Sequence, residues 1–86
     1  MVKSMHTVYV LKSISAEKSY VGMTENLERR LGEHNAGKHA YTKRHVPWIV
    51  IHEEIYSTLH NARIREKYLK SAAGRRFLKE NIFDNQ

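Results

Sequence analysis

The sequence predicts a small α+β domain built around a mostly antiparallel β-sheet. Residues 6–13 and 48–56 are rich in β-branched and aromatic residues, a composition typical of strands, and residues 19–22 begin or form a further strand. Residues 14–18 form the predicted turn between the first two strands, which lie close enough in sequence to pair as a hairpin. With the helices described next, the predicted order is β-β-α-β-α-α.

The first predicted helix follows the hairpin. Thr24 is its expected N-cap, because a threonine hydroxyl can accept a hydrogen bond from the first helical turn, and Glu25 and Glu28 suit the positive end of the helix dipole. The helix should run to about Ala36 and stop at Gly37, since glycine readily adopts the backbone conformation that ends helices.

Two more helices are expected after the third strand. Ser57 or Thr58 can cap a helix over residues 59–73. Gly74 should interrupt that helix because glycine is a poor helix former, and residues 75–82 should form a short final helix.

Length and composition narrow the class of protein. The chain has 86 residues, and we expect one domain over residues 1–86 with its core at about residues 6–82. It has no cysteine, which excludes a disulfide framework, thiolate zinc sites and thiol nucleophiles and fits a cytoplasmic protein. No apolar run reaches the ~18 residues of a membrane span, and the N-terminus lacks a signal-peptide pattern. We therefore expect neither a membrane partner nor a disulfide-linked one.

The charge balance suggests a polyanionic partner. The formal net charge is +6 and the pI is near 9.8, which favours a polyanion such as nucleic acid, although many small cytosolic proteins are also basic. Residues 38–46 have no hydrophobic period and form a predicted loop. The side chains expected to contact phosphates are Lys38, Lys43 and Arg44 in that loop and Arg75 in the last helix.

Polar residues interrupt the apolar face of the first helix. Leu27, Leu31 and His34 fall at positions i, i+4 and i+7, and Arg30 lies on the same face. An arginine at the edge of an apolar stripe can extend its charged end into water, so the pattern alone leaves a structural role for Arg30 open.

The second helix places a carboxylate on its apolar face. A stripe with steps of 3, 4, 3 and 4 residues comprises Leu59, Ala62, Glu66, Leu69 and Ala73. Glu66 therefore occupies the predicted centre of that face, where a carboxylate is costly unless it is paired or bound to a metal ion. The pattern is compatible with two roles for Glu66, a buried ion pair with Arg30 or a metal site.

The polar candidate residues limit the reactions that the protein could catalyse. Tyr9 and Tyr20, from the hairpin, are individually more often core aromatics than catalysts. Together with Arg30 and Glu66, and with no serine or cysteine triad, they leave metal-assisted attack of water on a phosphate. No histidine pair has the spacing of a zinc motif, but His34 lies one helical turn from Arg30.

Four ordered segments resemble one known family. Residues 7–9 resemble its GIY element and residues 19–22 its YIG element, and residues 26–31 and 62–67 resemble the elements that carry its arginine and its glutamate. The resemblance spans about residues 6–82 and is to the GIY-YIG nuclease superfamily. The chain is most similar to the short stand-alone members, which in turn resemble the N-terminal nuclease domain of the bacterial excision-repair incision subunit.

This resemblance implies a three-stranded antiparallel sheet flanked by helices and a metal-dependent endonuclease that acts on DNA, including structured or damaged DNA. It implies one Mg²⁺ or Mn²⁺ ion held by Glu66, with Tyr9 as the favoured general base and Tyr20 as its positioning partner. The catalytic residues that it implies are Tyr9, Tyr20, Arg30, His34 and Glu66, and it adds Gly22 and Asn81 to the expected substrate contacts.

Two other functions remain open on the sequence. The first is a non-catalytic nucleic-acid-binding module, whose phosphate contacts would come from the basic residues between positions 63 and 79. These are Arg63, Arg65, Lys67, Lys70, Arg75, Arg76 and Lys79, against Glu66 alone. The second is a protein-interaction domain that uses the fold without chemistry.

Overall fold

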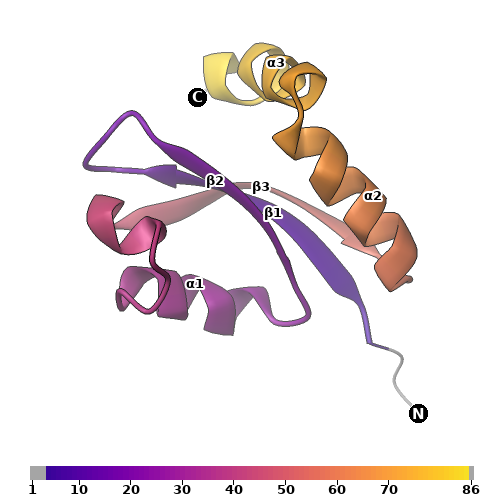
Figure 1. Cartoon of the computed structure of the whole chain (residues 1–86), viewed down its shortest axis with the longest axis horizontal. Coiled ribbons are helices and arrows are strands. Elements are labelled where there is room, and N and C mark those ends of the chain that lie inside the picture. Colours follow the sequence, from indigo (N-terminus) through magenta and orange to yellow (C-terminus); the bar gives the residue numbers. More distant parts are fainter. Residues whose placement is uncertain (1–3, 86) are drawn as a thin grey trace.

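A three-stranded antiparallel sheet forms the centre of the molecule, with helices on both of its faces (Figure 1). The computed structural model describes residues 4–85. The strand order is β2-β1-β3, so β1 is the central strand. The elements are β1 (His6–Ser13), β2 (Ser19–Thr24), α1 (Leu27–Asn35), η1 (Thr42–His45), β3 (Trp48–Tyr56), α2 (Leu59–Lys70), α3 (Ala72–Asn81) and η2 (Phe83–Asn85). The predicted fold class and element order are confirmed.

One face of the sheet packs against α2 and α3. Val8 and Val10 of β1 are buried against Ala62 and Leu69 of α2 and Leu78 of α3. Successive side chains of a strand point to opposite faces, so Val8 and Val10 share this side. Each fully buried aliphatic side chain contributes roughly 1.5–3 kcal/mol, and this cluster therefore fixes α2 on the sheet.

The other face of the sheet packs against α1. Tyr9 and Leu11, which alternate with the two valines, are buried with Trp48 of β3, and Leu27 and Leu31 of α1 pack against them. Because β1 is buried on both faces, it shows no polar alternation. The face that holds Tyr9 is therefore the face that α1 covers.

The first helix begins later than predicted. Asn26 is its N-cap, and the Asn26 side chain accepts a hydrogen bond from the Arg29 backbone N–H. Thr24 is the last residue of β2, and its hydroxyl bonds both backbone groups of Asn26 instead of a helical N–H. The predicted cap at Thr24 was wrong because a threonine hydroxyl can close a local turn as readily as cap a helix. Gly37, with φ of 79°, follows the helix as predicted.

The second helix ends earlier than predicted, at Lys70. Ser71 caps the next helix, with its side chain accepting a hydrogen bond from the Gly74 backbone N–H. Gly74 therefore lies inside the first turn of α3 and does not interrupt α2. A Cβ atom on Gly74 would overlap the Tyr68 carbonyl group. Gly74 thus permits a close approach between the two helices, and its role as the breaking residue was wrong.

Candidate active site

Side chains from β1, β2 and α1 meet on the α1 side of the sheet. The Tyr9 hydroxyl lies 2.9 Å from His34 Nε2. The Tyr20 ring centroid lies 6.3 Å from that of Tyr9 and 5.0 Å from that of His34. The Tyr20 hydroxyl lies 3.3 Å from Nε2 of His39, a residue of the segment after α1 that was not predicted to belong to the site. The structure thus brings together three predicted site residues and one that the sequence did not reveal.

Gly22 makes room for Tyr9. The two residues are opposite each other in the β1–β2 ladder. A Cβ atom on Gly22 would overlap the Tyr9 phenol and would come within 2.9 Å of the Tyr20 ring. Gly22 lies within β2 and is not in a turn, and Gly37 is the positive-φ glycine of the described chain. Its contribution is the absence of a side chain, which lets the phenol lie across the strand.

A chain of buried hydrogen bonds extends from Tyr9 into the protein. His34 is fully buried, and its Nδ1 lies 2.8 Å from the Thr42 hydroxyl oxygen, which is also fully buried. The Thr42 carbonyl accepts a hydrogen bond of 2.8 Å from the Trp48 indole. Thr42 was missed because residues 38–46 show no sequence pattern, yet residues 42–45 form the short helix η1 that brings Thr42 to His34.

Burial controls the protonation of both members of this pair. Burial raises the pKa of the Tyr9 phenol above its ordinary value, the charge of Tyr20 raises it further, and Arg30 partly opposes the shift. Burial also lowers the pKa of His34 to about 4, with the charges of His39 and Arg30 acting in the same direction. At neutral pH, therefore, Tyr9 keeps its proton and His34 is uncharged.

The low pKa of His34 predicts acid sensitivity. The unfolded chain takes up a proton at His34 near pH 6.5, whereas the folded protein does so only near pH 4. The free energy of unfolding should therefore fall as the pH drops through this window, by about 2 kcal/mol between pH 7 and pH 5. Urea unfolding at the two pH values measures the change.

A histidine comparison isolates this effect. Glu54, whose folded pKa is about 2, loses its stabilising contribution only below pH 4.5. Its titration therefore does not hide the change in stability that His34 causes between pH 7 and pH 5. His34→Asn should flatten the pH dependence, and His60→Asn, at an exposed position of α2, should leave it unchanged. A wild-type stability that is constant from pH 7 to pH 5 would contradict the assigned state of His34.

Glu66 lies on the sheet-facing stripe of α2 but is partly exposed. Of the predicted apolar stripe, Ala62 and Leu69 are fully buried, but the Leu59 side chain is exposed and Ala73 belongs to α3. The Glu66 side chain is 17% exposed and lies 3.2 Å from Lys70 Nζ. The apolar stripe is shorter than predicted because α2 ends at Lys70, before Ala73, and Glu66 lies between its two buried residues.

Arg30 and Glu66 are not paired with each other. Arg30 Nη1 lies 3.3 Å from Glu33, and Glu66 pairs with Lys70, so each forms an ion pair within its own helix. Within residues 4–85, the buried Arg30 Nε has no hydrogen-bond partner. Lys70 Nζ lies 5.9 Å from the Tyr20 ring centroid, which links Glu66 to the tyrosines. Arg30 and Glu66 also both influence the Tyr9 pKa, so both charges lie near the phenol.

The available donors fit a sparse divalent-cation site. The part of the chain that the structure describes contains no group of three or more histidine or carboxylate side chains that could enclose a metal ion. Mg²⁺ needs no such group, because it keeps several water ligands and is often held by one or two carboxylates together with substrate phosphates. Glu66 supplies one carboxylate whose charge acts on the Tyr9 phenol, and its partner Lys70 is half exposed.

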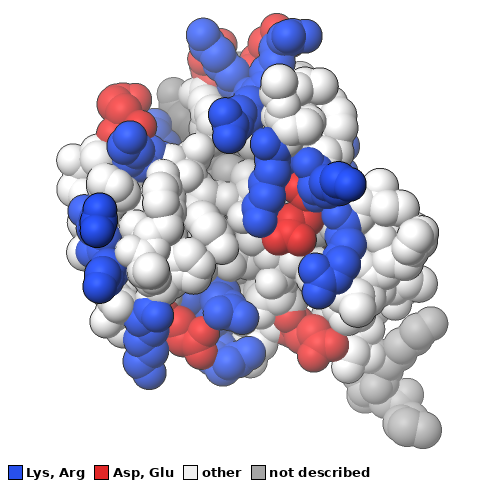
Figure 2. Space-filling model, viewed as in Figure 1, with Lys and Arg blue, Asp and Glu red and all other residues white. Residues whose placement is uncertain are grey.

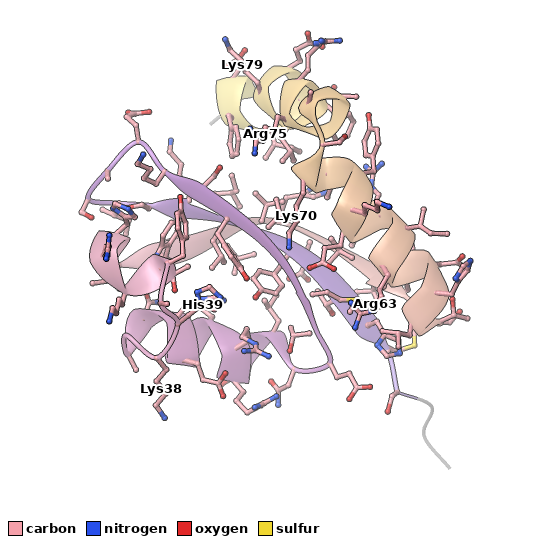
Figure 3. All side chains as sticks on the ribbon, viewed as in Figure 1. Lys38, His39, Arg63, Lys70, Arg75 and Lys79 are labelled. Carbon is pink, nitrogen blue, oxygen red and sulfur yellow. The ribbon has the colours of Figure 1, made fainter. Side chains whose placement is uncertain are left out.

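A cleft of about 560 Å³ adjoins Tyr20. Its lining includes Tyr41, Lys70, Arg75 and Lys79 beside Tyr20. Figure 3 shows the labelled residues of α2 and α3, including Lys70 and Arg75, on one side of β2 and Lys38 and His39 on the other. Lysine and arginine side chains are spread over this face, with isolated acidic residues between them (Figure 2).

The predicted substrate contacts lie in different places. Arg75 lines the cleft, and Lys38, Lys43 and Arg44 are exposed beyond α1. Asn81 lies at the end of α3, where its side chain donates to the Phe77 carbonyl. Of these positions, Arg75 shares the lining of the cleft with Tyr20.

Arg65, one of the basic residues considered as a phosphate contact, is instead bound to a carboxylate within the protein. Its guanidinium donates to both Glu54 carboxylate oxygens, at 2.8 and 3.1 Å, and lies over the Phe77 and Tyr68 rings. Burial acts to raise the pKa of Glu54, but hydrogen bonds from Arg65, Tyr56 and His52 outweigh it and hold the pKa at about 2. Arg65 therefore ties α2 to β3 and α3.

Comparison with known proteins identifies the family. Residues 5–81 match the family described as the GIY-YIG catalytic domain. This chain belongs to the GIY-YIG family. The family is a nuclease superfamily whose members typically use a divalent metal ion. The matched segment includes all of the predicted site residues from Tyr9 to Asn81.

Relatives of this GIY-YIG chain have similar lengths. A UPF0213 protein of Staphylococcus haemolyticus is 37% identical over 75 residues, which are 86% of this chain and 90% of the relative. A UPF0213 protein of Natronomonas pharaonis is 43% identical over 67 residues, 77% of this chain and 78% of the relative. The solution NMR structure of a UPF0213 protein from Bacillus halodurans matches with a TM-score of 0.54 and 26% identity, covering 88% of this chain and 83% of that one.

The helices of this GIY-YIG chain are short. Within residues 4–85, none is both long and apolar enough to cross a membrane.

Proposed function

We propose that this protein is a metal-dependent endonuclease that hydrolyses phosphodiester bonds in DNA, including structured or damaged DNA. The observation that supports this function best is the convergence of Tyr9, Tyr20, Arg30, His34 and Glu66 beside the edge strand β2. Phenol, guanidinium, imidazole and carboxylate groups in one place supply proton transfer, charge stabilisation and a cation ligand.

Tyr9 serves as the general base. Its phenol keeps its proton at neutral pH, so it acts by passing that proton to His34 Nε2 as it accepts one from the attacking water. The water oxygen bonds to phosphorus, and the bond to the 3′ oxygen breaks with its electron pair on that oxygen, which then takes a proton from solvent. Tyr20, closer to the surface, positions the water.

The two charged residues act on the phosphate. Arg30, whose Nε has no partner within residues 4–85, donates to the non-bridging oxygens and stabilises the charge that develops there. Glu66 holds the divalent ion through its carboxylate. When bound, Mg²⁺ or Mn²⁺ neutralises charge on the scissile phosphate and on the leaving 3′ oxygen.

DNA is held by the basic residues around β2. Lys70, Arg75 and Lys79 line the cleft next to Tyr20, and Lys38 lies on the other side of the strand (Figure 3). Cations on both sides of the site let the phosphates flanking the scissile bond be neutralised together. Tyr41, 44% exposed on the same cleft, offers a ring on which a base can stack.

The competing function is a nucleic-acid-binding module without catalysis. The observation that favours it is the burial of Tyr9, which is only 2% exposed. In that case the Tyr9–His34 pair would support the core, and the basic residues alone would carry the function.

A cleavage assay separates the two functions. We expect cleavage of at least one substrate among branched, flapped, single-stranded and duplex DNA in Mg²⁺ or Mn²⁺. We expect none after EDTA is added, because EDTA removes the cation that Glu66 would hold. RNA of matched sequence serves as the comparison. Tight binding to all DNA forms without metal-dependent cleavage would support the binding module and contradict the nuclease.

A further inference from the structure

Behind Tyr9 and His34, the buried polar chain continues to the Thr42 hydroxyl, which the proposed reaction does not use. His34 lies between two hydroxyl groups, with its Nε2 2.9 Å from the Tyr9 oxygen and its Nδ1 2.8 Å from the Thr42 oxygen. All three side chains are at most 2% exposed. Both distances are those of well-formed hydrogen bonds. In this buried position, each ring nitrogen of His34 therefore has one assigned partner.

The two hydroxyl groups are chemically unequal. A neutral imidazole carries a proton on one nitrogen and a lone pair on the other, so one hydroxyl must donate to the ring and the other must accept from it. A phenol is the stronger acid, with a pKa near ~10, and its oxygen lone pair is delocalised into the ring, so Tyr9 is the better donor and Thr42 the better acceptor. Both preferences select the tautomer with its proton on Nδ1.

We propose that Thr42 is a positioning residue of the active site: its hydroxyl accepts the Nδ1 proton of His34 and keeps Nε2 free to receive the proton of Tyr9. The expected tautomer follows from the hydrogen-bond geometry alone, whereas its effect on cleavage rests on the proposed nuclease function. In the opposite tautomer, Nε2–H would donate to the phenol oxygen, and Tyr9 would have no acceptor for its own proton in His34.

The structure holds Thr42 in place from a third element. The Trp48 indole of β3 donates to the Thr42 carbonyl at 2.8 Å. The Asn35 side chain, one residue after His34, bonds both the backbone N–H and the carbonyl of Trp48, at 2.6 and 3.1 Å. A closed path thus runs from α1 through β3 and η1 back to α1. Such a connected set of hydrogen bonds restricts both the position and the rotation of the His34 imidazole ring.

Other charged groups face the same ring without replacing Thr42. The His39 ring centroid lies 5.0 Å from that of His34, and the charges of Arg30 and Glu33 also act on His34. The His39 Nδ1 atom is buried and has no hydrogen-bond partner within residues 4–85. Among these neighbours, Thr42 is the one that bonds Nδ1 of His34, so its hydroxyl selects the tautomer.

The side-chain ¹⁵N signals of His34 report this tautomer directly, because a protonated ring nitrogen and one with a lone pair resonate far apart. In ¹⁵N-histidine-labelled protein at pH 7.5, without metal or DNA, we expect a protonated Nδ1 and an unprotonated Nε2. A protonated Nε2 in the wild type would overturn the proposal, whether or not the protein cleaves DNA. A protonated Nδ1 in a protein that cleaves no substrate would support the proposal and reject only the nuclease function.

Two variants test whether Thr42 sets the tautomer. Thr42→Val removes the acceptor at nearly constant volume, so we expect His34 to shift to the Nε2-protonated form and cleavage to fall by about 10²-fold. Thr42→Ser keeps the hydroxyl and should retain both the wild-type tautomer and cleavage within about threefold of wild type.

The outcomes are decisive in either direction. A Thr42→Val protein that keeps Nδ1 protonated would overturn the proposal, because the tautomer would then not depend on the hydroxyl. A Thr42→Ser protein that loses as much activity as Thr42→Val would also overturn it, because the retained hydroxyl would not preserve the activity. If Thr42→Val fails to fold, wild type and Thr42→Ser still decide, since the proposal requires a protonated Nδ1 in both.

Discussion

Glu66→Gln should lower the cleavage rate by about 10²–10³-fold and leave the fold intact. Glutamine keeps the shape of the side chain and removes the negative charge that would hold the cation. The stability should change by less than about 1 kcal/mol, because the lost interaction is an ion pair with the half-exposed Lys70 within one helix. Single-turnover cleavage at saturating Mg²⁺ and thermal melting of the same preparations measure the two effects.

Glu54→Gln is the matched control. Glu54 lies opposite Val8 in the sheet, on the face away from Tyr9, and accepts hydrogen bonds from Arg65, Tyr56 and His52. Removing its charge should cost about 1–3 kcal/mol of stability and leave the cleavage rate of the folded protein near wild type. A Glu66→Gln protein that cleaves as fast as wild type would exclude Glu66 as the metal ligand. A Glu66→Gln protein as destabilised as Glu54→Gln would indicate a structural carboxylate.

Tyr9→Phe should lower cleavage by about 10²–10⁴-fold, the range that a positioned general base contributes. The loss should exceed that of Tyr20→Phe, because the Tyr9 hydroxyl bonds His34 at 2.9 Å, whereas Tyr20 bonds the less buried His39 at 3.3 Å. Both substitutions keep the aromatic ring, so the comparison isolates the hydroxyl groups. Cleavage rates of the two variants on one substrate, at equal occupancy, provide the measurement.

The opposite ranking would reassign the base. If Tyr20→Phe loses more activity than Tyr9→Phe, the more exposed phenol takes the proton from water and Tyr9 holds the site together. Equal and small losses in both variants would contradict tyrosine as the base altogether, because neither hydroxyl would then transfer a proton in the rate-limiting step.

The strands could be predicted from the sequence, whereas two helix ends could not. Residues 6–13 and 48–56 are the observed β1 and β3, since runs of β-branched and aromatic residues have few other stable conformations. The cap at Asn26 and the helix break at Ser71 depend on which of several nearby polar side chains reaches a free backbone N–H. Local sequence offers more than one candidate for each, and tertiary packing chooses among them.

Part of the candidate active site could also be predicted from the sequence, and part could not. The sequence motifs singled out Tyr9, Tyr20 and Arg30, and the structure places them near one another. Thr42 and His39 could not be predicted, because they lie in a segment without hydrophobic periodicity, and their contacts exist only once residues 38–46 fold against α1. The predicted apolar stripe around Glu66 was too long, because the helix stops after Lys70 and Ala73 belongs to the next helix.

The clamp between Arg65 and Glu54 determines which way Glu66 points. Adjacent residues on a helix differ by about 100° in direction, so holding one of them sets the direction of the next. The Arg65 guanidinium is fixed to β3 by Glu54 and to α3 by the Phe77 ring. The helix therefore cannot rotate about its axis without breaking these contacts, so they also hold the direction of the Glu66 carboxylate, whose charge acts on the Tyr9 phenol. The orientation of Glu66 thus depends on contacts that its neighbour makes with β3 and α3.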